Sequence, residues 1–370
     1  MREVNLKTIA KNVACVTAIL LALVVSLQML GRNLADSSVT AAAQSAQQKF
    51  KAVWEPINYK QDLALHDVFF VDDQVGWVSG DKGTILFTND GGDTWSPQLG
   101  GDPGAAGSPI SDLFFLDAKT GWARQHYDTM LRTGNGQDWQ ETGAVRENGV
   151  HFVSATRGFH PYGGAIRVTE DGGRNWKDAW RCRAKMEVDG LTREENCSVV
   201  DLHFPTLQVG YGVGTARITS RTEDGGATWT ALIGPEEQGD QRVWKVHFTS
   251  ETSGVQIRGM GDARFLRTDD GGKTWTGVVG SAGFDMRFAN SSVGWSFREN
   301  GLHSYTSDGG RRWTARQTKF PAPVKAFSLP RPDRGYVVGD HGMIYRYRVV
   351  PIGYAAKGLI DAPMMPASGE

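Results

Sequence analysis

The stretch TNDGGDTW at residues 88–95 decides the fold, because close variants of it recur along the chain. The other copies are TGNGQDW (133–139), TEDGGRNW (169–176), TEDGGATW (222–229), TDDGGKTW (268–275) and TSDGGRRW (306–313). Repeats separated by several tens of residues are typical of supersecondary units that bury their apolar faces only by stacking on their neighbours. The sequence therefore predicts a repeat architecture.

A second pattern, an apolar strand followed by a turn and a Gly-aromatic pair, recurs more often than the Asp turn. Its copies are DVFFVDDQVGW (67–77), DLFFLDAKTGW (112–122), GVHFVSATRGF (149–159), DLHFPTLQVGY (201–211), KVHFTSETSGV (245–255), DMRFANSSVGW (285–295) and KAFSLPRPDRGY (325–336). Units of roughly 40 residues with short apolar runs between Gly and Asp suit four-stranded blades. We predict an all-β fold, a seven-bladed β-propeller of four-stranded antiparallel blades, over residues 50–349.

The seventh unit is incomplete, because it runs through GDHGMIYRYRV (339–349) and stops before any Asp turn. Ahead of the first unit, Trp54-Glu55-Pro56 resembles Trp95-Ser96-Pro97, the start of a fourth strand. We therefore expect residues near Trp54 to pair with the last blade, which would close the ring and leave no open sheet edge.

The repeated turn has a local, structural chemistry. Its paired glycines supply positive φ angles, its Asp accepts hydrogen bonds from backbone N–H groups of the same turn, and its Trp covers the turn. The structural residues are Asp90, Asp171, Asp224, Asp270, Asp308, Trp95, Trp176, Trp229, Trp275 and Trp313. Calcium binding is the alternative, but the EF-hand pattern of alternating acidic residues and a closing Glu is absent. We predict no metal and no cofactor.

An uncharged apolar run, VACVTAILLALVVSLQML at residues 13–30, precedes the repeats. About 18 such residues is near the minimum for a membrane-spanning helix. Three basic residues lie before it, so the N-terminus would stay in the cytoplasm and the rest would be exported. We predict a signal anchor at residues 1–32 and a linker at 33–49; a cleaved export signal remains the alternative.

The propeller would then be periplasmic or otherwise extracytoplasmic, held to the inner membrane by the N-terminal helix. Residues 350–370, rich in Pro, Ala, Gly and Met without a period, predict a flexible tail. A net charge of -1 and a pI near 6.7 give no general argument for nucleic acid as a partner. We expect a monomeric propeller.

The longest unit carries an insertion, WRCRAKMEVDGLTREENC at residues 180–197. Cys182 and Cys197 are the two cysteines outside the apolar segment, and in an exported protein they predict a disulfide that closes a hairpin. Zinc would need more ligands than two thiols, and no His lies between them. The hairpin is a candidate partner-binding projection.

The turns match the Asp-box, also called the bacterial neuraminidase repeat. With seven units, Gly-Trp at the second strand and an export segment, residues 50–349 resemble the photosystem II stability and assembly factor family of seven-bladed propellers. The resemblance implies a non-enzymatic lumenal factor that helps to assemble a membrane-protein complex. The implied partner is a photosystem II reaction-centre subunit in a photosynthetic host, and otherwise another membrane protein or a transporter.

A candidate binding face lies opposite the Asp turns, where loops between second and third strands and between blades gather. Arginine and aromatic residues are enriched at protein interfaces, although each one alone is more simply a solvated loop residue. The predicted partner-binding rim consists of Arg124, His126, Tyr127, His160, Tyr162, Arg258, Arg264, Arg298 and His341.

Three function classes remain open at this point: the assembly scaffold, an exported glycan- or peptide-binding module, and a sialidase-type glycoside hydrolase. Sialidases need an arginine cluster, a Tyr nucleophile and a separate Asp acid/base, and the Arg-Ile-Pro element ahead of their first Asp box is missing here. The GxGxG sequence at residues 210–214 is a weak dinucleotide motif with no helix expected after it. We predict that the protein is not an enzyme.

Overall fold

The computed structural model of this chain describes residues 50–57, 59–126, 128–145, 149–188, 191–215, 217–233, 242–259 and 263–364. The chain forms two compact units, of which Lys51–Val350 with Ala355–Glu370 is the larger and Met1–Phe50 with Pro351–Tyr354 the smaller. The predicted anchor at 1–32 and linker at 33–49 lie outside the described residues. Within the described ranges, no helix is long and apolar enough to cross a membrane.

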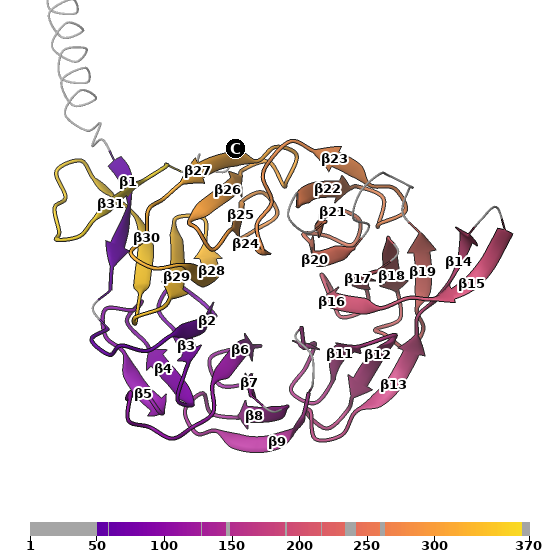
Figure 1. The fold of residues 1–370 in the computed structure, drawn as a ribbon, viewed down its shortest axis with the longest axis horizontal. Coiled ribbons are helices and arrows are strands. Elements are labelled where there is room, and N and C mark those ends of the chain that lie inside the picture. The colour runs from indigo at the N-terminus through magenta and orange to yellow at the C-terminus, as the bar shows by residue number, and fades with distance from the viewer. Residues whose placement is uncertain are drawn as a thin grey trace, which may run out of the picture. The chain divides into compact units, whose positions relative to one another are not determined.

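The larger unit is a ring of antiparallel sheets, as Figure 1 shows. Blade 1 is β2 (Leu65–Phe70), β3 (Gly76–Gly80), β4 (Thr84–Thr88) and β5 (Ser96–Leu99). Blade 2 is β6 (Ile110–Phe115), β7 (Gly121–Gln125), β8 (Thr129–Thr133) and β9 (Gln140–Ala144). Blade 3 is β10 (His151–Phe152), β11 (Gly158–Tyr162), β12 (Ala165–Thr169) and β13 (Lys177–Arg181).

The ring continues with three further blades of the same order. Blade 4 is β16 (Val199–His203), β17 (Gly210–Gly214), β18 (Ile218–Thr222) and β19 (Thr230–Ile233). Blade 5 is β20 (Val243–Phe248), β21 (Gly254–Arg258), β22 (Arg264–Thr268) and β23 (Thr276–Val278). Blade 6 is β24 (Asp285–Phe288), β25 (Gly294–Phe297), β26 (Leu302–Thr306) and β27 (Thr314–Gln317).

Blade 7 closes the ring, because its strands β28 (Val324–Arg331), β29 (Arg334–Gly339) and β30 (Ile344–Pro351) are completed by β1 (Phe50–Pro56). Trp54 on β1 is 1 % exposed, and its ring lies 5.4 Å from that of Trp295 and 5.5 Å from that of Tyr347. The predicted seven-bladed propeller and its closure through Trp54 are both confirmed.

The C-terminal segment differs from the flexible tail that we expected at residues 350–370. Strand β31 (Ile360–Ala362) pairs with β1, with Trp54 opposite Ile360 and Ala52 opposite Ala362. The outer edge of β1 would otherwise present unpaired backbone N–H and C=O groups, and β31 covers that edge. Residues 360–362 therefore form a fifth strand of the last sheet.

The Gly-aromatic signature is explained by close packing within and between blades. A Cβ atom on Gly76 would lie 2.6 Å from the ring of Phe70 in the same blade, so only glycine fits there. The next residue, Trp77, stacks on Phe115 of blade 2 with ring centroids 3.7 Å apart. The same stack recurs between other neighbouring blades: Trp122 on Phe152, Tyr211 on Phe248 and Tyr336 on Phe70.

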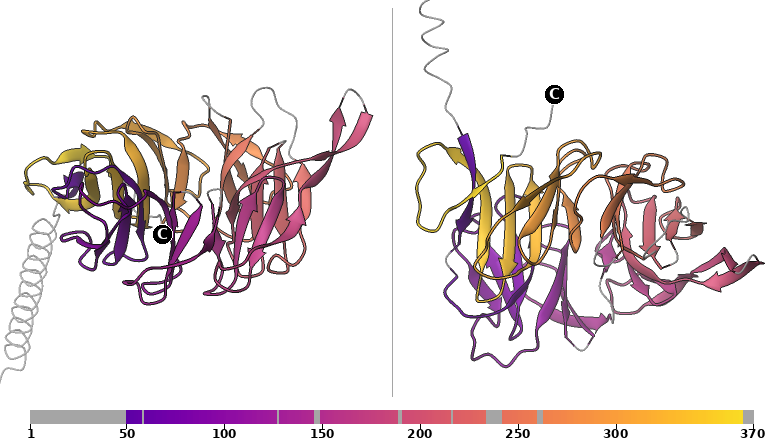
Figure 2. Two further views of the ribbon diagram at one scale, coloured as in Figure 1. Left: turned by 60° about the horizontal axis from the view of Figure 1, so that its bottom comes forward. Right: turned by 45° about the horizontal axis from the view of Figure 1, so that its top comes forward.

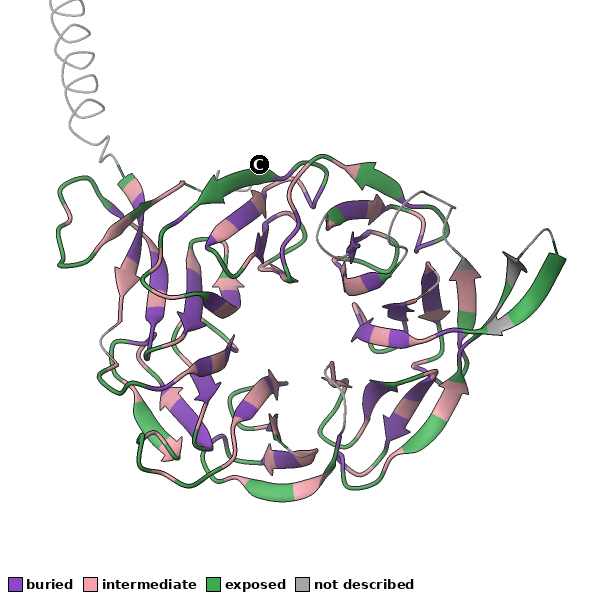
Figure 3. Cartoon of the chain, viewed as in Figure 1, coloured by how far each residue is buried: buried purple, intermediate pink, exposed green. Residues whose placement is uncertain are grey.

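In blades 1, 2, 3, 5 and 6, the fourth strand is less buried than the second and third strands. Figure 3 shows this gradient most clearly in blade 6, where β25 is buried and β27 is exposed along its length. The strands that carry the repeated apolar pattern thus form the cores between blades, while the fourth strands of these five blades face solvent. The fourth strand of blade 7, β1, is instead buried at its centre.

A two-stranded hairpin, β14 (Arg183–Val188) and β15 (Leu191–Asn196), follows blade 3 and projects outward from the ring (Figure 2). The structure joins Cys182 and Cys197 by a disulfide at the base of this hairpin. Both cysteines are buried and pack with Phe159 and Val199. The insertion in the longest unit is therefore a stapled hairpin.

Candidate functional site

The repeated turn is a closed hydrogen-bonded unit, and the copy at Thr222 is representative. Thr222 Oγ1 donates to Asp224 Oδ1 at 2.8 Å and accepts from the backbone N–H of Gly226 at 2.8 Å. Thr228 donates its N–H to Oδ1 at 2.8 Å and its hydroxyl to Oδ2 at 2.6 Å. Hydrogen bonds from Thr228 and then Thr222 favour the carboxylate and lower the pKa of Asp224 to about 2. Both of its oxygens are therefore engaged within the turn.

At the other copies a backbone N–H likewise donates to the side-chain Oδ1, including the copy at residues 133–139, where Asn135 takes the place of the aspartate. Gly225 and Gly226 have φ angles of 67° and 83°, as the turn requires. The weak GxGxG sequence at residues 210–214 is the strand β17 rather than a phosphate-binding loop. Among the residues described, no group of three or more His, Cys, Asp or Glu is placed to hold a metal ion.

The tryptophans of the turns differ in whether the indole N–H has a hydrogen-bond acceptor. Trp176 and Trp275 each donate to a glycine carbonyl of their own turn at 3.1 Å. The indole nitrogens of Trp95, Trp229 and Trp313 are buried with no hydrogen-bond partner within the described ranges. The tryptophans of the turns therefore do not share one common hydrogen bond.

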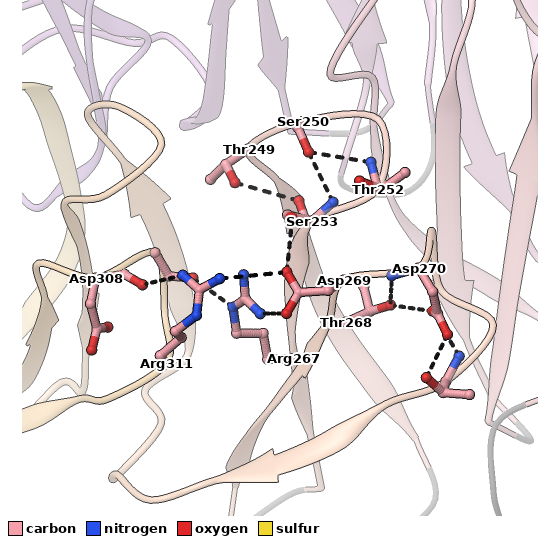
Figure 4. A network of polar contacts seen from close by, with 12 residues as sticks. Thr249, Ser250, Thr252, Ser253, Arg267, Thr268, Asp269, Asp270, Asp308 and Arg311 are labelled. Atoms are coloured by element: carbon pink, nitrogen blue, oxygen red, sulfur yellow. Dashed lines mark hydrogen bonds and ion pairs between the residues drawn. The ribbon is translucent and has the colours of Figure 1, made fainter.

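An arginine on the third strand of blade 5 joins its own turn to the turn of blade 6. Figure 4 shows Arg267 of blade 5, which is bound to Asp269 and donates its Nε–H to the carbonyl oxygen of Gly309 in blade 6 at 3.0 Å. From the blade 6 turn, Arg311 donates to the carbonyl oxygen of Asp308 at 3.1 Å. The turns of blades 5 and 6 are therefore bonded to each other through Arg267.

A central cavity of about 370 Å³ lies along the inner strands. Its walls come from alternate positions of the apolar pattern, since side chains two residues apart on a strand share a face. The first position supplies Asp67, Asp112, Asp201, Lys245 and Asp285, and the third supplies Phe69, Phe114, His151, His203, His247 and Arg287. Sequence reasoning missed these residues. When the copies of the pattern are aligned, however, they fall at two positions, the first and the third.

The cavity aspartates connect neighbouring blades. Asp67 accepts the backbone N–H of its neighbour Val68 and that of Leu113 in blade 2, both at 2.8 Å. Asp201 accepts the N–H of Val246 in blade 5 at 2.9 Å. Burial, opposed by the charge of Arg287, raises the pKa of Asp67 to about 7.

A row of charged side chains completes this side of the cavity. Lys245 Nζ lies 3.5 Å from a carboxylate oxygen of Asp201 and 3.7 Å from one of Asp285. Arg287 donates its Nε–H to Asp285 at 2.9 Å. The attraction of Asp201 raises the pKa of Lys245, so the lysine is charged at neutral pH. Opposite charges thus compensate one another along the wall.

Three histidines from blades 3, 4 and 5 form a neutral part of the cavity wall. The ring of His203 lies 5.6 Å from that of His151 and 4.2 Å from that of His247. Burial lowers the pKa of His151 to about 4 and that of His247 to about 3. The N–H of Phe248 donates to His203 Nδ1 at 3.3 Å, which assigns the ring proton of His203 to Nε2.

Two residues of the predicted rim are brought together beside the cavity. Arg124 pairs with Asp112, donating its Nε–H at 2.7 Å, and so belongs to the cavity wall. His160 is buried on the neighbouring blade, and burial with the charges of Arg167 and Arg124 lowers its pKa to about 4. His126 is exposed, and Tyr127 lies outside the described residues.

The remaining rim residues do not form one cluster. Arg258 is only 2 % exposed, so its expected place at the surface is wrong; it ends β21 with its side chain inside the ring. Arg264 is exposed, and Arg298 donates to the carbonyl oxygen of Ala282 at 2.8 Å. His341 is exposed and contacts Asp62 at 2.8 Å. These four residues are spread over blades 5 to 7, whereas the exposed Tyr162 lies on blade 3, with its ring 6.0 Å from that of His160.

Comparison with known proteins gives a consistent family signal for part of the chain. Residues 46–198 match the family model described as photosynthesis system II assembly factor YCF48. A curated relative, the chloroplastic photosystem II stability/assembly factor HCF136 of Guillardia theta, is 43 % identical over 47 residues. That matched stretch spans 12 % of this chain and 12 % of the relative.

Solved structures share the fold at low sequence identity. YCF48 bound to D1 peptide has a TM-score of 0.57 at 21 % identity, covering 80 % of this chain and 96 % of that one. YCF48 from Cyanidioschyzon merolae has 0.58 at 20 %, covering 80 % and 98 %. A GH74 enzyme from Niastella koreensis has 0.57 at 12 %, covering 79 % and 53 %. The chain is thus a seven-bladed propeller that resembles the photosystem II stability and assembly factor family.

Proposed function

We propose that this chain is a non-enzymatic scaffold that binds a membrane-protein complex and helps to assemble or stabilise it. The observation that carries the proposal is the match of residues 46–198 to the YCF48 assembly-factor family. A propeller of the same fold, YCF48, has been solved with a D1 peptide bound. In a photosynthetic host the partner would be a photosystem II reaction-centre subunit, and elsewhere another membrane protein.

The bonding of the cavity carboxylates supports a binding role over a catalytic one. Asp67 and Asp201 accept backbone N–H groups of neighbouring blades, and Asp112 and Asp285 are paired with arginines. A glycosidase needs one carboxyl group free to give a proton and another free to act as base or nucleophile. Carboxylates that are already bonded in this way are poorly suited to either role.

The tether and the location belong to the same proposal. The basic residues ahead of the apolar run at 13–30 favour a cytoplasmic N-terminus and an exported propeller. To test this orientation, protease is added to whole cells and to intact spheroplasts. We expect the propeller to be digested in the spheroplasts but not in the whole cells. Digestion only after the inner membrane is broken would contradict it.

The binding and catalytic alternatives are separated by two assays on the purified full-length chain. Titration with the D1 peptide should give saturable binding if the partner is a photosystem II reaction-centre subunit. Incubation with xyloglucan tests the glycosidase alternative, since GH74 xyloglucanases share the fold at 12 % identity. We expect no release of reducing sugar, and measurable turnover would overturn the non-enzymatic assignment.

A further inference from the structure

A second cavity, of about 740 Å³, opens at the outer part of blade 3, on the face opposite the Asp turns. His160 on β11 lies directly across from Arg167 on β12, which lies across from Asp178 on β13. Because paired residues of neighbouring strands share a face, these three side chains form a row along the cavity. Arg181 and Tyr162 also line it.

His160 lines this cavity and carries a buried polar atom that is unsatisfied. Its side chain is 1 % exposed and packs edge-on against Trp176, with ring centroids 5.5 Å apart. Its Nδ1 has no hydrogen-bond partner within the described ranges. A buried polar atom without a partner is unfavourable, and a local opening that lets a ligand hydrogen-bond to it would remove that penalty.

The cationic residues of the cavity share a single carboxylate. Asp178 contacts Arg181 at 2.5 Å and Arg167 at 3.5 Å. Arg167 also donates to the carbonyl oxygen of Trp176 at 2.8 Å and lies over the ring of Tyr162, 5.4 Å from its centroid. With His160 neutral, two guanidinium groups and one carboxylate leave one positive charge uncompensated.

We propose that this cavity binds the carboxylate of an acidic side chain from a partner polypeptide. The single excess charge matches a monoanion better than the dianion of a phosphate group. Arg181, whose side chain is 72 % exposed, has free donor capacity beyond Asp178, and a proton on Nδ1 lets His160 donate as well. Tyr162 provides an apolar wall for the methylene groups of a Glu side chain.

This inference names a contact for the proposed scaffold and rests on that function only for the partner's identity. A fluorescein-labelled peptide with two glutamates, and its glutamine counterpart, can be titrated into the full-length chain in detergent at low salt. We expect the glutamate peptide to bind more tightly. Arg181→Gln should weaken its binding on the order of tenfold, since a charge-assisted hydrogen bond is lost.

Two further variants keep the test specific. Arg183→Gln, on the exposed hairpin and outside the cavity lining, removes the same charge and should leave affinity within twofold. His160→Phe keeps an aromatic ring against Trp176 and should weaken binding several-fold. Equal affinity for the two peptides, or equal loss in Arg181→Gln and Arg183→Gln, would overturn the proposal.

Vesicles of phosphatidylglycerol provide the competing anion. Binding to vesicles that depends on Arg181, without preference for the glutamate peptide, would assign the cavity to a lipid phosphate and contradict the carboxylate proposal. A third outcome separates this proposal from the scaffold function. If Arg181→Gln still recovers a membrane complex and the chain shows no preference for the glutamate peptide, this cavity is not the binding site, but the scaffold function is not affected.

Discussion

The hydroxyl of Tyr336 donates a 2.9 Å hydrogen bond to the carbonyl oxygen of Gly91 and thereby joins the last blade to the first. The same carbonyl accepts from Arg346 at 2.8 Å, and Arg346 also donates to Glu55 on β1 at 2.8 Å. The ring of Tyr336 stacks on Phe70, with centroids 3.6 Å apart. Side chains from both ends of the repeat array therefore fix the closure of the propeller.

Removing this hydroxyl should loosen the closure without removing the stack. We expect Tyr336→Phe to lower the free energy of unfolding by about 1 kcal/mol, since Gly91 keeps its bond from Arg346. Urea unfolding monitored by tryptophan fluorescence measures the change. Tyr345→Phe is the control, because its hydroxyl makes no hydrogen bond within the described ranges. Equal effects of the two variants would contradict this role of Tyr336.

Close packing at the signature glycines predicts a second difference. A Cβ on Gly121 would lie 2.3 Å from the ring of Phe115, whereas one on Gly277, in the exposed strand β23, would have no atom within 4 Å. Gly121→Ala should therefore cost about 3 kcal/mol of stability through overpacking. Gly277→Ala should change it by no more than about 0.5 kcal/mol. Similar urea midpoints for both variants would show that the signature has another cause.

The cavity predicts a pH dependence through Asp67. Burial raises its pKa to about 7, so between about pH 4 and 7 the folded protein holds a proton that the unfolded chain has released. Asp67 therefore contributes fully to the free energy of unfolding below about pH 4, and this contribution is lost as pH rises through about 7.

The free energy of unfolding of the wild type minus that of Asp67→Asn should therefore fall as pH rises across this window. The slope should reach at most about 1.4 kcal/mol per pH unit. The subtraction cancels the opposite contribution of the buried histidines, whose lowered pKa values destabilise the fold at acid pH. A difference that stays constant with pH would mean that Asp67 is ionised in the folded state.

The disulfide predicts a measurable gain in stability from a short cross-link. In the chain-entropy model, a loop of about 15 residues contributes roughly 3 kcal/mol. Cys182→Ser with Cys197→Ser should lower the midpoint of thermal unfolding, and dithiothreitol should lower that of the wild type but leave the double variant unchanged. An unchanged wild-type midpoint under reduction would show that the hairpin unfolds independently of the ring.

The architecture was predictable because its signals are local and repeated. Gly76 and Trp77 act through contacts that every blade copies, and the likeness of Trp54 to Trp95 marked the missing strand. Strand β31 gave no such signal, because its three residues lack a repeated pattern and pair only with an edge that the closure itself creates.

The site was less predictable, because burial in a ring depends on neighbouring blades. Arg258 was expected on the rim because it lies beside the link between the second and third strands of its blade, yet the packed blades enclose it. Asp67 and His151 occupy the first and third positions of the repeated apolar pattern. These positions face one common cavity only because the blades close into a ring. Alternation along the first strands was the signal that could have found them.

The central claim, that the propeller is a scaffold for a membrane-protein complex, is tested most directly by quantitative cross-linking in native membranes. The full-length chain is cross-linked, purified in detergent, and its partners are measured by mass spectrometry. The variants are Arg264→Ala with Arg298→Ala on the predicted rim, and Arg316→Ala on the exposed outer strand β27 as control. We predict that subunits of one membrane complex are recovered with the wild type and the control, and fall several-fold with the rim variant. Recovery of no membrane protein above the level of an unrelated anchored protein would contradict the account.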